Sequence, residues 1–205
     1  QRFLVVGSNG NYQLKYGTKI EAYGQIGIGI ETIDKINGYG NRNGIYTIEL
    51  QKDNKTIYKS EMTKFSFDNS RALNSLIDYE FYLKEKIRFQ RSYIEPNNPL
   101  GIYKESENNG IVNFKQNSSF NFKYIVNDSY KNQYKLSFKI DGNIDKKNLP
   151  NVIKQRFDTT FSYKDSNFFA KHNIQVRIPK DALYNDLNFH YFEADTAWGA
   201  ITHTY

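Results

Sequence analysis

The chain has 205 residues, no cysteine and a formal net charge of +6. The lack of cysteine excludes disulfide bonds and thiolate metal sites. No apolar stretch approaches the roughly 20 residues that a membrane-spanning helix needs. The lysines are dispersed along the sequence, so we expect no nucleic-acid partner. The apolar residues include 17 Tyr and 15 Phe, and aromatic residues favour β-strands.

Short alternating segments separated by turn residues begin at Gly17. They are residues 19–23, 26–30, 45–50, 56–58, 110–114, 121–126 and 134–140. In the segment 26–30, three isoleucines share one face, and Asp53-Asn54 is placed to form a hairpin turn. This spacing predicts an all-β sandwich, because alternating strands and helices would produce longer helical segments between the strands.

Residues 65–103 interrupt the alternation. Residues 78–86 predict a turn or two of helix, and Pro96 and Pro99 close the segment because proline cannot continue a strand ladder or a helix interior. We therefore predict a first domain at residues 1–141, an immunoglobulin-like β-sandwich with a loop or helical insertion at about 65–103.

A second, partial β domain is expected at residues 142–205. Turn-forming residues dominate 141–150. Beyond them, two apolar faces follow, formed by Ile174, Val176 and Ile178 and by Leu187, Phe189 and Tyr191. Gln1 is an unusual first residue and residues 200–205 resemble a strand without a closing turn, so we expect a segment of a longer protein.

The sequence offers little for catalysis. His172, His190 and His203 lack the short spacing of zinc ligands, and no Gly-x-Ser-x-Gly elbow is present. Asp78 and Glu80 are candidate carboxylates for an acid/base pair, although solvated charges explain them more simply. We expect no metal site, no cofactor and no catalytic residue.

A glycine-rich loop near Asp34 leaves two interpretations open. Asp34, Asn37, Asn41 and Asn43 carry the oxygen ligands that calcium accepts. Asn and Gly in such a loop also form left-handed turns without any ion.

Aromatic residues crowd the insertion and are the main binding signal. They are Tyr79, Phe81, Tyr82, Phe89 and Tyr93. Such side chains stack on sugar rings or anchor a partner protein. The alternative is that they pack the insertion against the sandwich as a small core.

Several ordered blocks carry a family resemblance. They are IGIGIETID at 26–34, NGIYTIEL at 43–50, FSFD at 65–68, IDY at 77–79 and NGIVNF at 109–114. Together they resemble the region downstream of the peptidase domain in lysostaphin/LytM-type zinc endopeptidases of Bacteroidetes envelopes. The segment VRIPKDAL at 176–183 resembles the strand and turn of ZU-type β domains.

The zinc ligands of that family, a His-x-x-x-Asp and a His-x-His, have no counterpart in this sequence. The resemblance therefore implies a non-enzymatic accessory or binding module, exported to the periplasm or the outer membrane. The implied partners are peptidoglycan or envelope proteins and an upstream peptidase-like domain of the same protein. A structural subunit of an outer-membrane assembly and a carbohydrate-binding domain are the alternatives. Asp158-Thr159-Thr160 and Asp195-Thr196-Ala197 resemble O-glycan acceptor triplets.

Overall fold

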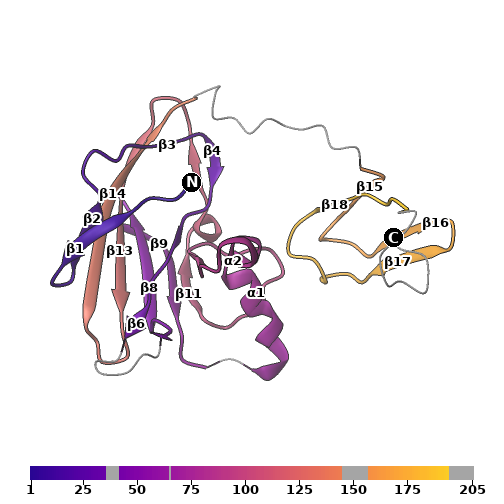
Figure 1. The fold of residues 1–205 in the computed structure, drawn as a ribbon, viewed down its shortest axis with the longest axis horizontal. Helices are drawn as coiled ribbons and strands as arrows, with labels where there is room; N and C mark the ends of the chain where they lie inside the picture. Colours follow the sequence, from indigo (N-terminus) through magenta and orange to yellow (C-terminus); the bar gives the residue numbers. More distant parts are fainter. Residues whose placement is uncertain (36–41, 65, 145–156, 194–205) are drawn as a thin grey trace. The chain divides into compact units, whose positions relative to one another are not determined.

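The computed structural model describes residues 1–35, 42–64, 66–144 and 157–193. The chain divides into two compact units: Gln1–Ile94 with Asn98–Lys147, and Glu95–Asn97 with Asn148–Tyr205 (Figure 1). Strands account for 44% of the structure and helices for 12%, which confirms the predicted all-β class with a small helical insertion. Within the described residues, every helix is too short or too polar to cross a membrane.

An eight-stranded sheet forms one layer of the first unit. Its order is β1-β2-β14-β13-β8-β9-β11, and β3 also pairs with β14. The bounds are β1 (Val5–Ser8), β2 (Asn11–Leu14), β3 (Ile20–Ala22), β8 (Thr47–Lys52), β9 (Lys55–Glu61), β11 (Tyr103–Ser106), β13 (Ser119–Asn127) and β14 (Gln133–Gly142). The pairings of β14 with β2 and β3 are parallel, and the others are antiparallel.

Alternation along the central strands builds the core. Tyr124 of β13 lies opposite Leu50 of β8 on one side and Leu136 of β14 on the other, and all three are buried. Successive side chains of a strand point to opposite faces of a sheet. The predicted alternation of residues 45–50 is therefore confirmed, since Ile48 and Leu50 point into the core.

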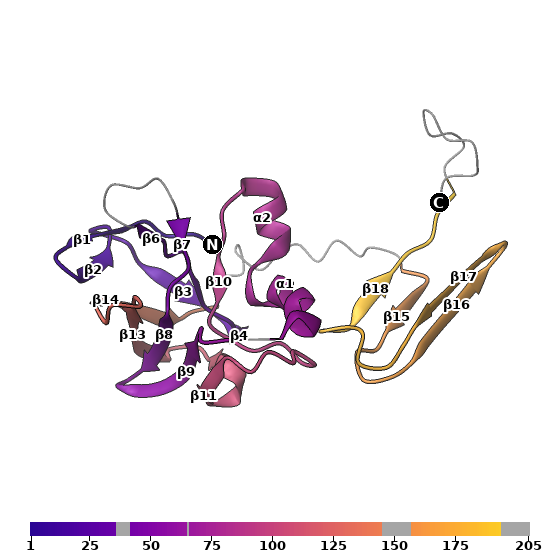
Figure 2. The same cartoon turned by 90° about the horizontal axis from the view of Figure 1, so that it is seen from below.

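A second layer of short pairs covers the inner face of this sheet. The pairs are β4 (Gly24–Ile26) with β12 (Val112–Phe114) and β5 (Gly29–Ile30) with β10 (Gln90–Arg91). Ile26, Ile28 and Ile30 pack against the core from this layer, as the shared isoleucine face predicted. The arrangement is sandwich-like, and Figure 2 shows it from a second direction.

The hairpin between β8 and β9 turns at Asp53-Asn54, as predicted. Both residues are left-handed, with φ of 47° and 65°, the conformation that two-residue hairpin turns require. The pairing of β8 with β9 has a register shift between Leu50 and Gln51. It leaves Ile57 and Tyr58, two successive residues of β9, both buried.

The insertion contains three helical segments and a small core of its own. The segments are η1 (Phe67–Ala72), α1 (Leu73–Leu76) and α2 (Tyr79–Glu85), so the predicted helix at 78–86 is confirmed. Its core residues are Ala72, Leu76, Leu100 and Ile102. The Asn98 amide donates to the Ser75 hydroxyl at 3.2 Å and to the Tyr103 hydroxyl at 2.8 Å. It thereby connects a helix, the loop and β11. A further helical turn, η2 (Asn108–Gly110), precedes β12.

The second unit consists of two strand pairs in its described part. β15 (Thr159–Phe161) pairs with β18 (Leu187–Phe189), and β16 (Asn167–Lys171) pairs with β17 (Ile174–Ile178). Phe161 is its most buried ring and contacts Phe189 at a centroid distance of 5.1 Å. The predicted alternation of residues 174–178 is confirmed.

Two features differ from the sequence analysis. The hairpin of β1 and β2 was not predicted, because Val5–Ser8 lies at the sheet edge with every residue exposed and shows no burial alternation. Leu187, expected on an apolar inner face, has 43% of its surface exposed. Of that predicted face, Tyr191 is the buried member.

Candidate binding site

Helix α2 is defined at both ends by local sequence. The Asp78 carboxylate accepts the backbone N–H of Phe81 at 3.1 Å, which caps the N-terminus. At the other end, Lys86 is left-handed with φ of 59°, and its N–H donates to the Tyr82 carbonyl. A Glu80–Lys84 pair at 2.6 Å lies along the exposed side. The helix therefore presents its side chains in a defined order.

The insertion aromatics fall into two groups, and the first faces the protein. Phe81 and Phe89 meet edge to face at 5.7 Å and 88°. Phe89 also lies against Gly29 of β5, where a Cβ atom would come within 3.3 Å of its ring. These two residues attach α2 to the second layer.

Tyr93 belongs to the same inward group. Its ring lies directly on the backbone of Gly27, where a Cβ atom would come within 2.5 Å of two ring carbons. The Arg91 guanidinium lies 5.7 Å from the ring centre. The contacts of Phe81, Phe89 and Tyr93 in the structure are therefore those of packing residues.

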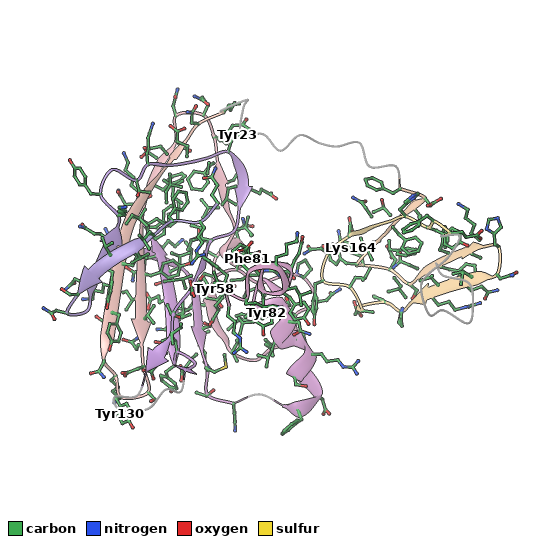
Figure 3. The ribbon with its side chains drawn as sticks, viewed as in Figure 1. Tyr23, Tyr58, Phe81, Tyr82, Tyr130 and Lys164 are labelled. Atoms are coloured by element: carbon green, nitrogen blue, oxygen red, sulfur yellow. The ribbon has the colours of Figure 1, made fainter. Side chains whose placement is uncertain are left out.

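Tyr79, which is exposed, and Tyr82, which is half-buried, form the second group. Their rings are 6.1 Å apart and inclined at 36°, and Tyr79 is 43% exposed. Figure 3 labels Phe81 and Tyr82, consecutive residues of the same short helix. The predicted binding aromatics therefore point in different directions within one turn of helix, because neighbouring residues project about 100° apart.

Three further residues, which were not among the predicted binding residues, extend this group. Leu83 is 52% exposed, and the cations of Lys86 and Arg88 lie 5.8 Å and 5.5 Å from the Tyr82 ring centre. The positions 79, 82, 83 and 86 follow the i, i+3, i+4, i+7 spacing of one helix face, a signal that was present in the sequence. We call Tyr79, Tyr82, Leu83, Lys86 and Arg88 the α2 face.

The histidines of the described residues are held by separate carboxylates. His190 Nδ1 lies 2.8 Å from Asp158, and His172 Nδ1 lies 2.8 Å from Glu193. Within residues 1–35, 42–64, 66–144 and 157–193, no group of three or more His, Asp or Glu side chains is placed to hold a metal. His203 lies outside the described residues.

Asp158 contacts three other residues of the second unit through its carboxylate. Its carboxylate accepts the backbone N–H of Tyr191 at 2.8 Å and also meets Lys171 at 3.2 Å and His190. The Tyr191 N–H is the largest influence, and together these donors lower the pKa of Asp158 to about 2. Asp158 therefore holds the residues after β18 against the start of β15.

The structure describes part of the loop near Asp34 and one of the two predicted acceptor triplets. Asp34 pairs with Asn43 where β6 (Asp34–Lys35) meets β7 (Arg42–Asn43), while Asn37 and Asn41 lie outside the described residues. In the first acceptor triplet, the Thr160 hydroxyl donates to the Asn188 side chain at 2.9 Å. Asp195-Thr196-Ala197 also lies outside the described residues.

The architecture defines an all-β protein that exposes aromatic residues on a helical insertion. Residues 158–205 match the family model of the Zu5-like domain, a match that covers less than half of the chain. It includes the segment 176–183, so the predicted likeness to this domain type is confirmed there. Comparisons with curated proteins and with solved structures find no match for this chain.

Proposed function

We propose that the chain is a non-catalytic accessory module of a murein-peptidase-like cell-envelope protein and holds an envelope partner through the α2 face. The observation that supports this proposal most is the division of the insertion aromatics. Phe81 and Phe89 attach the helix, while Tyr79 is 43% exposed and the half-buried Tyr82 lies beside it. Exported to the periplasm or the outer membrane, such a module would position an upstream peptidase domain.

The chemistry of the α2 face suits a binding role. Tyrosine offers a large contact area at a low entropy cost together with a polar hydroxyl, and it is enriched among residues that dominate interface energies. The nearby cations of Lys86 and Arg88 supply charge around the Tyr82 ring. Peptidoglycan or an envelope protein is the partner we propose.

The non-catalytic part of the proposal has separate support. In the sequence, the zinc motifs of the resembling endopeptidases have no counterpart. In the structure, His172 and His190 pair with different carboxylates rather than with one shared group. Hydrolysis by a zinc peptidase requires ligands that converge on a single ion.

A retention experiment tests the proposal. The full chain is incubated with purified peptidoglycan sacculi in one arm and with immobilised outer-membrane proteins in the other. We expect retention in one arm, and at least tenfold weaker retention of Tyr79→Ala/Tyr82→Ala, since each lost hot-spot ring costs about 1–2 kcal/mol. The matched control is Tyr130→Ala, because Tyr130 is 79% exposed at the far end of the β13–β14 hairpin (Figure 3).

The outcomes separate the parts of the proposal. No retention in either arm contradicts envelope binding. Retention that the double variant keeps contradicts the assignment of the α2 face. Equal losses of retention in the double variant and in Tyr130→Ala would show nonspecific binding through exposed aromatic residues rather than a defined site.

A glycan strand has one specific observation in its favour as the partner. The ring centres of Tyr79 and Tyr82 are 6.1 Å apart, close enough for neighbouring sugar rings to lie on both. A titration with soluble chitin oligosaccharides, followed by NMR, tests this: tyrosine shifts at 79 and 82 support the glycan. Retention by proteins without such shifts supports a protein partner.

A further inference from the structure

A cluster of lysines lies on the outer face of the main sheet, away from the α2 face. Lys135, Ser137 and Lys139 alternate along β14 with Leu136 and Ile140, which point into the core. Lys123 of β13 lies directly opposite Ser137. Opposite residues are about 5 Å apart and diagonal ones about 7–8 Å apart, so the register places three lysines around Ser137.

The surface is hollowed at the same place. A depression of about 510 Å³ is lined by residues that include Asn54, Asn121, Lys123, Ser137 and Lys139. Among the polar side chains that line it, the two amides, the hydroxyl and the two ammonium groups can donate hydrogen bonds, whereas the Asp53 carboxylate can only accept them.

The acidic residues around the hollow already have partners. The Asp53 carboxylate accepts the backbone N–H of Asn121 at 2.9 Å. Asp141 accepts the Ser119 hydroxyl at 2.7 Å and lies 3.2 Å from Lys139. Lys123 and Lys135 form no ion pair with the part of the chain that the structure describes. Their charges are therefore available.

We propose that this hollow, which we call the Ser137 site, binds a compact oxyanion, a phosphate or carboxylate group. Like charges at neighbouring sheet positions repel each other, and an oxyanion between them would relieve this repulsion while accepting hydrogen bonds from Lys123 and Ser137. Nucleic acid is a less suitable ligand, because it follows a longer basic stripe. The sequence did not reveal the cluster, since cross-strand pairing brings residue 123 beside residue 137. This site is independent of the partner of the α2 face.

The test uses the full chain, with inorganic phosphate and acetate as probes at constant ionic strength. Phosphate is expected to raise the Tm, because a ligand that binds the folded state stabilises it, and acetate shows whether a carboxylate suffices. Lys123→Gln should weaken phosphate binding about tenfold, the loss expected for one charge-assisted hydrogen bond. It should also raise the Tm without phosphate, since repulsion is removed.

Lys104→Gln is the matched control. It makes the same change of charge on β11, the edge strand that β8 and β9 separate from β13, and should bind phosphate as the unchanged protein does. The proposal is overturned if neither anion raises the Tm beyond chloride, or if both variants respond alike. Binding of single-stranded DNA with a salt dependence that requires many phosphates would also overturn it.

Discussion

Two buried tyrosines of the core differ in whether their hydroxyl group forms a hydrogen bond. The Tyr124 hydroxyl donates to the Ser92 hydroxyl at 2.8 Å, and both residues are buried. The Tyr58 hydroxyl is buried without a hydrogen bond, although the Ser60 and Gln90 side chains lie near it. Burial raises the pKa of Tyr58 to about 12. The same substitution should therefore have different consequences at the two positions.

Tyr124→Phe is expected to lower the free energy of unfolding by about 1–3 kcal/mol, because it leaves the Ser92 hydroxyl without its donor. Tyr58→Phe should leave the free energy of unfolding unchanged or raise it by about 1 kcal/mol, because it removes an unsatisfied polar group. Urea unfolding of both variants measures the difference. Equal losses would show that the Tyr58 hydroxyl is in fact hydrogen-bonded.

Asp158 predicts acid sensitivity in the second unit. Its pKa is about 2 in the folded protein and about 3.9 in an unfolded chain. Because folding lowers the pKa, the carboxylate stabilises the unit above about pH 4, and this contribution is lost as the pH falls toward 2. Asp158→Asn should remove that dependence, as followed by NMR signals of Phe161 and Phe189.

The control for Asp158 is Asp165→Asn. Asp165 is exposed, and its carboxylate makes no hydrogen bond or ion pair with the residues that the structure describes. This variant should keep the acid transition of the unchanged protein. An Asp158→Asn transition at the same pH as the control would contradict the role of Asp158.

At the scale of elements, the insertion depends on close contacts with the second layer. Gly27 between β4 and β5 leaves room for the Tyr93 ring, and Gly29 leaves room for Phe89. The helix at 78–86 could be predicted from the sequence, as could the turn at Asp53-Asn54. The direction of each aromatic could not, because Phe89 meets a glycine that lies 60 positions earlier in the chain.

Gly27→Ala should lower the free energy of unfolding by about 1–3 kcal/mol, since its Cβ atom would overlap the Tyr93 ring. Gly101→Ala is the matched control, because a Cβ atom at Gly101 meets nothing within 4 Å. That variant should stay within about 0.5 kcal/mol of the unchanged protein. Chemical denaturation measures both, and equal effects would show that Tyr93 moves aside without loss.

The cap of α2 predicts a coupling between stability and binding. A helix of seven residues is too short to form alone, so Asp78→Ala should loosen it at a cost of about 1 kcal/mol. Partner retention should weaken although Tyr79 and Tyr82 remain. Glu80→Ala, which removes only an exposed ion pair, should retain the partner normally. Full retention by Asp78→Ala would show that the α2 face does not depend on helix order.

At the scale of the whole molecule, the composition and alternation were sufficient to predict an all-β chain. They indicated the strands that line the core, because burial and alternation coincide in β8, β13 and β14. They were insufficient for the exposed β1 and β2 hairpin and for the lysines around Ser137. These features depend on which strands become neighbours, which is a property of the folded chain rather than of any single segment.

One measurement tests the central claim that the chain binds an envelope partner without cutting it. The full chain is incubated with purified peptidoglycan, and the bound fraction and the newly released amino groups are recorded in the same sample, with added zinc in a parallel one. With peptidoglycan as the partner, we predict a bound fraction that Tyr79→Ala/Tyr82→Ala reduces; with either partner, we predict no release of amino groups in either sample. Release of murein peptides by this chain alone would contradict the account.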